Sequence, residues 1–258
     1  MSWPAWAAAL VADPRLPWAI AMIMLAGVVR GASGFGQALV FVPLAGVFYP
    51  PSVAVPLLWL ADALVTPLLV RPHLRQAEWA EVLPLVIGGA VLLPVGILVL
   101  THLDPLVLRW VICVTVLVST LAIAAGWRFQ VTATRPWAVA VGGLAGFFGG
   151  ATGMSGPPLI LFWLGRSAQA ARIRSNIFLY LWITGLISLA VAAMKGLLPA
   201  PLLAAGLVLA PCYAAATLVG NVVFHRAGRH LADRREALFR RAALGLCAAS
   251  AMLGLPIW

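Results

Sequence analysis

Apolar runs long enough to cross a lipid bilayer fill most of this sequence. A membrane-spanning helix needs about 20 predominantly apolar residues, and eight runs approach or exceed that length: 17–48, 52–70, 82–101, 105–127, 136–165, 173–194, 199–224 and 238–257. Only 9% of the residues are charged, whereas a soluble domain carries about 25%. The sequence therefore excludes a soluble domain and predicts an all-α polytopic membrane protein.

Two of these runs are interrupted by glycine-rich strings. The strings are GASGFGQ at Gly31–Gln37, within 17–48, and GGATGMSGPP at Gly149–Pro158, within 136–165. A straight helix of about 32 residues would be about 48 Å long, well beyond a hydrocarbon core of about 30 Å. Glycine and proline also disfavour a continuous helix. Each broken run therefore either crosses once with a kink or enters and leaves on the same side.

Basic residues in the loops distinguish these two topologies, because basic loops stay in the cytoplasm. If both broken runs are re-entrant, six crossings divide the loop residues 13 to 3, whereas eight crossings divide them 10 to 6. The minority of three is Arg15, Arg109 and Lys195. The sequence thus predicts six crossings, two re-entrant elements and both termini outside the cytoplasm. The thirteen cytoplasmic residues are then Arg71, Arg75, Arg128, Arg135, Arg166, Arg172, Arg174, Arg226, Arg229, Arg234, Arg235, Arg240 and Arg241.

The two broken runs resemble each other at an offset of 119 residues, which aligns Gly31–Gly34 with Gly150–Gly153. Three full-length runs follow each of them, so the chain divides into a first repeat, 1–127, and a second repeat, 136–258. An odd number of crossings per repeat makes the repeats inverted, and their glycine strings are expected to meet near the middle of the bilayer. The alternative is that the glycines only allow helices to pack closely.

The expected helix breaks suit an anion. A new helix should begin at about Phe35 and another at about Gly156, each with unpaired N–H groups at the positive end of its dipole. Glycines let an anion approach such groups closely. Ser and Thr in the strings either donate to the anion or only cap the broken helices. The candidate substrate-binding residues are Arg30, Gly31, Ser33, Gly34, Phe35, Gly36, Gln37, Gly150, Thr152, Gly153, Met154, Ser155, Gly156 and Asn176.

Two ionisable residues, Arg30 and Asp62, lie deep within apolar runs, where such residues are functional candidates. Arg30 precedes the first glycine string and either contacts the anion or forms a structural ion pair. Asp62 either pairs with Arg30 or takes up a coupling proton. Arg172 and Arg174 are expected to face solvent or lipid headgroups rather than substrate.

The strings GASGFGQALVFVP and GGATGMSGPPLILFWL, one in each half of the chain, resemble those of the sulfite exporter TauE/SafE family, within the 4-toluene sulfonate uptake permease group. The resemblance covers nearly the whole chain. It implies a carrier in the bacterial cytoplasmic membrane for sulfite, sulfonate or sulfoacetate, working in export. Thiosulfate carriers related to this family look dependent on cysteines at their central loops. Neither glycine string of this sequence contains a cysteine, which argues against thiosulfate transport by that chemistry.

Two other functions remain open at this point. A passive anion channel could use the same backbone site. Both strings also contain G-x-S-G, ending at Gly34 and at Gly156, as an intramembrane serine protease would. A serine nucleophile needs a neighbouring base, however, and all four histidines fall in loops or at the ends of runs, so no enzyme is expected. The sequence suggests no metal site, no cofactor and no nucleic-acid partner, and it leaves a homo-oligomer open.

Overall fold

The computed structural model describes residues 14–70, 74, 77–126, 134–164, 170–227 and 232–256. Within these residues there are ten helices and no strand. In chain order they are α2 (Leu16–Ser33), α3 (Gln37–Ala45), α4 (Pro51–Val70), α5 (Trp79–His102), α6 (Pro105–Ala124), α7 (Arg135–Thr152), α8 (Gly156–Leu164), α9 (Ala170–Met194), α10 (Ala200–Ala227) and α11 (Ala232–Gly254). The all-α prediction is confirmed for this part of the chain.

Each apolar run of the sequence corresponds to a helix or to a pair of helices. The unbroken runs form α4, α5, α6, α9, α10 and α11, and the two broken runs form α2 with α3 and α7 with α8. By length and composition, five of the described helices can span a membrane, namely α2, α5, α6, α9 and α10. The apolar stretches of α4 and α11 are shorter, at Pro51–Pro67 and Ala242–Gly254. The chain has the helices of a multi-pass membrane protein, while the number of crossings stays a prediction.

Helix bounds repeat along the chain at the offset found in the sequence. Adding 119 to the bounds of α2 gives those of α7, and the same step takes α3 onto α8. It also takes the first residue of α4 onto the first residue of α9. The later helices match less closely: after the same step the ends of α5 and α10 differ by 2 and 6 residues, and those of α6 and α11 by 8 and 11. The orientation of the halves in a membrane is not described by these bounds.

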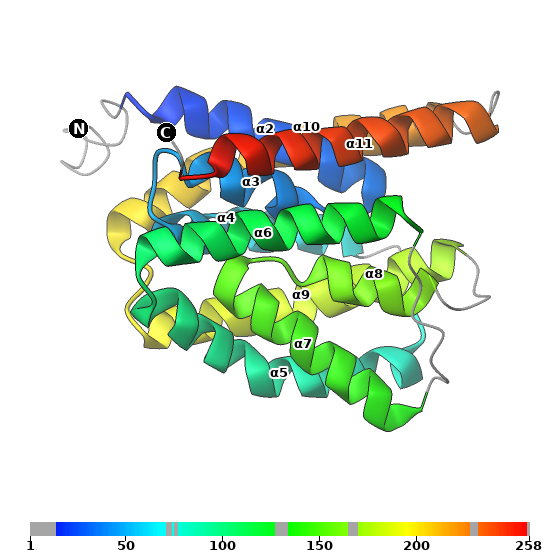
Figure 1. The fold of residues 1–258 in the computed structure, drawn as a ribbon, viewed down its shortest axis with the longest axis horizontal. Helices are drawn as coiled ribbons and strands as arrows, with labels where there is room; N and C mark the ends of the chain where they lie inside the picture. The colour runs from blue at the N-terminus through cyan, green and yellow to red at the C-terminus, as the bar shows by residue number, and fades with distance from the viewer. Residues whose placement is uncertain are drawn as a thin grey trace.

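The long helix of each broken run packs along a helix of the other half, α2 along α10 and α7 along α5. In Figure 1 α2 and α10 lie along the top of the view, and α5 and α7 lie along the bottom. These two pairs are equivalent under the repeat, since α2 corresponds to α7 and α10 to α5. Between them lie α3, α4, α8 and α9, with α11 against α3 and α6. Each broken helix is therefore packed along a helix from the opposite half.

Glycines bring these paired backbones into contact. A Cβ atom on Gly31 would lie 2.0 Å from the Thr217 carbonyl oxygen of α10. A Cβ atom on Gly150 would lie 2.3 Å from the Leu93 carbonyl oxygen of α5. No side chain fits at such distances, so these two predicted site residues lie at helix contacts. Close helix packing, the alternative explanation for the glycines, thus accounts for part of the pattern.

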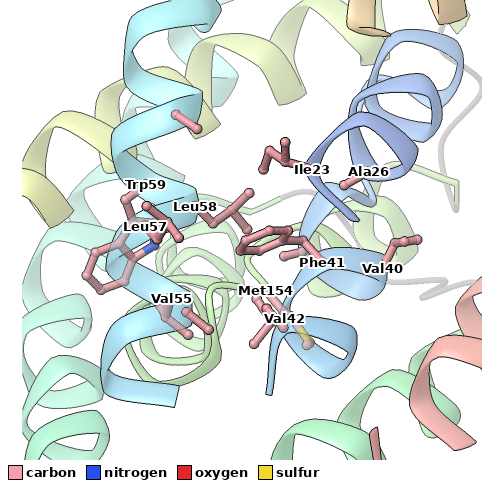
Figure 2. Close-up of a cluster of buried hydrophobic side chains, with 14 of the residues drawn as sticks. Ile23, Ala26, Val40, Phe41, Val42, Val55, Leu57, Leu58, Trp59 and Met154 are labelled. Carbon is pink, nitrogen blue, oxygen red and sulfur yellow. The ribbon is translucent and has the colours of Figure 1, made fainter. Parts of the chain in front are cut away.

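Two apolar clusters form the interior. The first joins buried side chains of α2 to α6 and of α9 to α11, among them Ile23, Phe41 and Leu58. Met154, from the break in the second half, belongs to this first cluster, and Figure 2 shows it beside Val42. The second cluster joins α5, α7, α8 and α9. Phe35, from the break in the first half, packs against it.

Most residues behind the topology prediction fall outside the described part of the chain. Of the thirteen basic residues expected in the cytoplasm, only Arg135, Arg172 and Arg174 have described side chains. The predicted orientation of the termini therefore stays a prediction.

Candidate functional site

Glycines in the left-handed conformation end α2 and α7. Gly34 has φ +83° and Gly153 has φ +76°, and each donates its N–H back to a carbonyl of the preceding helix. Gly36 is also left-handed, with φ +94°, and an L side chain is disfavoured there. As a result α3 begins at Gln37, two residues later than the predicted start at Phe35, whereas α8 begins at Gly156 as predicted.

Hydroxyl groups at equivalent positions cap both breaks. Ser33 Oγ donates to the Val29 carbonyl at 2.7 Å, and Thr152 Oγ donates to the Phe148 carbonyl at 2.8 Å. Ser33 Oγ also accepts from the Phe35 N–H at 3.3 Å. Each hydroxyl therefore donates its proton to a carbonyl of its own helix, which is the capping role that broken membrane helices require.

The two breaks meet. A small cavity of about 20 Å³ lies between them, with room for about one water molecule. Phe35 lies against Gly156, where an added Cβ atom would be 3.5 Å from the Phe35 Cβ. Seven of the predicted site residues line the cavity: Phe35, Gly36, Gln37, Gly153, Met154, Ser155 and Gly156.

The new helices offer unequal numbers of N–H donors at this cavity. α3 begins with Gln37, Ala38 and Leu39, whose N–H groups precede the first intrahelical bond. α8 begins with Gly156, Pro157 and Pro158, and proline has no N–H. Most of the free backbone donors therefore come from the first break.

Arg30 is fully buried beside the first break. Its Nη1 donates to Gln37 Oε1 at 3.2 Å and to the Gly34 carbonyl at 3.3 Å. Its Nη2 donates to Thr66 Oγ1 at 3.2 Å and lies 3.4 Å from Asp62 Oδ1. Arg30 Nε has no hydrogen-bond partner among the described residues. The guanidinium thus joins the break to the middle of α4.

Asp62 completes this network. Tyr213 of α10 donates its hydroxyl to Asp62 Oδ1 at 2.9 Å. The carboxylate therefore receives contacts from α2 and from α10, the two helices that pack along each other. Arg30 and Asp62 lie together as an ion pair, one of the two arrangements that the sequence left open for each of them.

Arg174 differs from its expected position. Its side chain is only partly exposed, and Nη2 donates to the Gly31 carbonyl at 2.8 Å and to Asn221 Oδ1 at 3.2 Å. The expectation that Arg174 faces solvent or lipid headgroups is wrong, because its stem extends inward along α9 to the end of α2. Arg172 does point outward and pairs with Glu78.

Asn176 is buried, but it faces α5 rather than the cavity between the breaks. Its Oδ1 accepts from the Glu78 N–H at 2.9 Å, and its Nδ2 donates to Glu81 Oε2 at 3.2 Å. Trp163 of α8 donates Nε1 to the same Glu81 oxygen at 3.3 Å. Asn176 therefore joins the start of α9 to the start of α5.

The sequence analysis did not identify Phe178, or the inward position of Arg174, beside the first break. Phe178 is buried, with its ring centroid 5.1 Å from Arg30 Cζ and 5.6 Å from Arg174 Cζ. Arg174 and Phe178 are four residues apart, so they share one face of a helix. That spacing was the available signal, but the neighbouring basic residues at 166 and 172 made it resemble a basic loop.

The sulfite exporter TauE/SafE family model matches residues 19–253, nearly the whole chain. The protein belongs to this family. Its TauE/SafE membership agrees with the resemblance seen in the two glycine strings, and with its several apolar helices it identifies a multi-pass membrane transporter. Searches of curated proteins and of solved structures find no match.

Members of the TauE/SafE family are transporters, which is consistent with a protein that is not an enzyme. The Ser33 hydroxyl bonds to backbone groups of its own helix end. Among the described residues, the histidine at the end of α5, His102, contacts Thr101 and the Leu98 carbonyl through Nδ1. The other three histidines lie outside the described side chains.

Proposed function

We propose that this protein carries small sulfur-containing anions, of the sulfite, sulfonate or sulfoacetate class, outward across the bacterial cytoplasmic membrane. The observation that carries the proposal is the meeting of two helix breaks at equivalent positions in the two halves, with Phe35 against Gly156. Paired helix breaks at the interface of two repeats are typical of transporter binding sites.

The anion would bind between the breaks, mainly through backbone N–H groups at the start of α3. These groups lie at the positive end of the helix dipole, where anions are stabilised. The Gln37 side chain adds a neutral donor from α3. Arg30 donates to Gln37 Oε1, so its guanidinium, which also pairs with Asp62, lies one hydrogen bond from the site and can favour an anion there.

Opening of the breaks is part of this proposal. The cavity of about 20 Å³ is too small for a sulfur oxyanion, so the conformation described here is closed around the site. Binding would require the two glycine strings to separate, and a carrier needs such a change to expose its site to each side in turn. Inverted repeats, with both termini outside the cytoplasm, remain part of the proposal.

A binding screen with purified protein tests the substrate class. Sulfite and sulfoacetate are compared with thiosulfate, sulfate and the net-neutral zwitterion taurine, and we expect saturable binding of sulfite or sulfoacetate. Counterflow in proteoliposomes then separates a carrier from a passive channel, because only a carrier accumulates labelled anion against unlabelled anion. Absence of binding and flux for every anion would contradict the proposal.

A further inference from the structure

The charges around the two breaks are not equivalent. At the offset of 119, Arg174 corresponds to Val55, and both lie directly over a break. An added Cβ on Gly34 would be 3.3 Å from Arg174 Cγ, and one on Gly153 would be 3.5 Å from Val55 Cγ1. The same backbone position is thus covered by a cationic side chain at the first break and by an apolar one at the second.

The neighbours of Arg174 show the same contrast. Arg30 corresponds to Gly149, and Asp62 corresponds to Leu181. Charged side chains are therefore found beside the first break, whereas the equivalent positions at the second break are apolar or glycine, and its polar side chains are the neutral Thr152 and Ser155. A solute that is recognised by its negative charge has its polar contacts at the first break.

Arg174 lies between the end of the bundle where α9 begins and the buried Arg30. Its guanidinium is partly exposed, whereas that of Arg30 is fully buried, and both lie within 6 Å of the centre of the Phe178 ring. Both guanidinium groups are cationic, and Asp62 lies beside Arg30 as its counter-ion. An anion beside Arg174 would add a second negative charge next to these two cations.

Two contacts of Arg174 are with neutral groups. It donates to the Gly31 carbonyl on α2 and to the side-chain oxygen of Asn221 on α10. Both acceptors are neutral, so a charged oxygen atom would make a stronger hydrogen bond with the same guanidinium. The Gly31 contact also crosses between the halves, from α9 to α2, so its exchange would remove one link between them.

We propose that Arg174 is a second anion-contacting residue of the first break, reached from the end of the bundle where α9 begins. An entering anion exchanges the Gly31 and Asn221 contacts of Arg174 for its own oxygen atoms and then passes Phe178 toward Arg30. This inference rests on the proposed transport function. The predicted topology places this end in the cytoplasm, as an exporter requires.

Sulfite binding to purified full-length variants tests the role of Arg174. We expect Arg174→Gln to raise the Kd for sulfite at least tenfold and Arg174→Lys to raise it less, because lysine keeps the charge without the planar fork. Asn221→Ala leaves the charge in place and is expected to keep the Kd within threefold. Arg172→Gln is the matched control, since Arg172 lies two residues away and faces outward, and it should bind as the wild type does.

Charge rescue separates anion contact from a purely structural role. Arg174→Cys is made with Cys113, Cys212 and Cys247 replaced by alanine, and is then modified with a cationic or an anionic methanethiosulfonate reagent. We expect the cationic adduct to recover sulfite affinity and the anionic adduct to lose it further. Equal affinity of the two adducts, or wild-type affinity in a folded Arg174→Gln variant, would overturn the inference. If the wild type itself neither binds nor transports any of the anions, the proposed function fails instead.

Discussion

Phe35 and Met154 occupy equivalent positions in the two helix breaks, and each packs into the apolar cluster that contains the broken helices of the other half. Met154 lies in the first cluster, with α2 and α3, and Phe35 lies against the second cluster, with α7 and α8. The breaks are therefore interlocked by their side chains as well as adjacent in space. Separation of the glycine strings, as anion binding would require, has to withdraw both side chains from these clusters.

Gly34→Val and Gly153→Val are expected to abolish anion binding while the protein still inserts. Both positions have positive φ, where a residue with a side chain costs about 1–2 kcal/mol and a β-branched one more. Gly126→Val is the matched control, because Gly126 has φ +68° with open space around it, far from any proposed contact. Equilibrium binding and melting temperature are measured together. Normal binding in the Gly34 and Gly153 variants would place the site elsewhere.

Asp62→Asn is expected to destabilise the protein by about 3–5 kcal/mol, because it leaves the buried Arg30 charge without its counter-ion. Arg30→Gln combined with Asp62→Asn should cost less than the sum of the two single changes, since neither charge is then left alone. Thermal unfolding in detergent measures the stability of the wild type, the two single variants and the double variant. Additive losses would show that the pair contributes little to stability.

The same double variant separates stability from anion recognition. If the Arg30 charge favours the anion, the double variant stays folded but binds sulfite more weakly than the wild type. Tyr213→Phe removes one hydrogen bond to Asp62 without changing a charge, so its sulfite affinity should remain close to that of the wild type.

Ser33→Ala and Thr152→Ala should have small and similar effects on binding. Thr152→Ala removes a hydrogen bond to a carbonyl four residues earlier, and Ser33→Ala removes the same kind of bond and the one accepted from the Phe35 N–H. Each bond is worth about 0.5–1.5 kcal/mol and holds a helix end rather than the anion, so affinity should fall by about tenfold at most. Isothermal titration with the bound anion checks both variants. A loss of a hundredfold or more would mean that the hydroxyl contacts the anion directly.

Asn176→Ala distinguishes a structural from a substrate-binding role for Asn176. The change breaks its contacts with Glu78 and Glu81 on α5, and a buried partner left unsatisfied costs about 1–3 kcal/mol. From this geometry we expect a lower melting temperature with little change in affinity. A selective loss of affinity at unchanged stability would instead support the sequence-based assignment of Asn176 to the substrate site.

Cysteine labelling tests the predicted topology at two described turns. A variant without its native cysteines receives either Leu103→Cys, at the turn between α5 and α6, or Ala125→Cys, at the end of α6. An impermeant maleimide added to intact cells should label position 103, predicted outside, and spare position 125. The opposite pattern would invert the topology.

The helices, the two helix breaks and the 119-residue offset could be predicted from the sequence, because the length of an apolar run and the position of a glycine determine the local backbone structure. The start of α8 at Gly156 follows directly from the two prolines after it. The positions of Arg174 and Asn176 could not be predicted, since each depends on which face of α9 meets which neighbour. The roles of Gly31 and Gly150 could not be predicted either. In the sequence, a glycine that contacts a ligand looks the same as a glycine that contacts a neighbouring helix, and only the position of that helix distinguishes them.

Packing of α2 along α10 affects how the chain is made. α10 begins 167 residues after α2 ends, and at roughly 5–20 residues per second that interval is about 10–30 s of synthesis. Asp62 emerges much sooner, so the Arg30 charge can be neutralised early, but the Gly31 face of α2 has to wait for its partner helix. A ribosome that stalls before α10 would leave that face against lipid, where membrane quality-control proteases can find it.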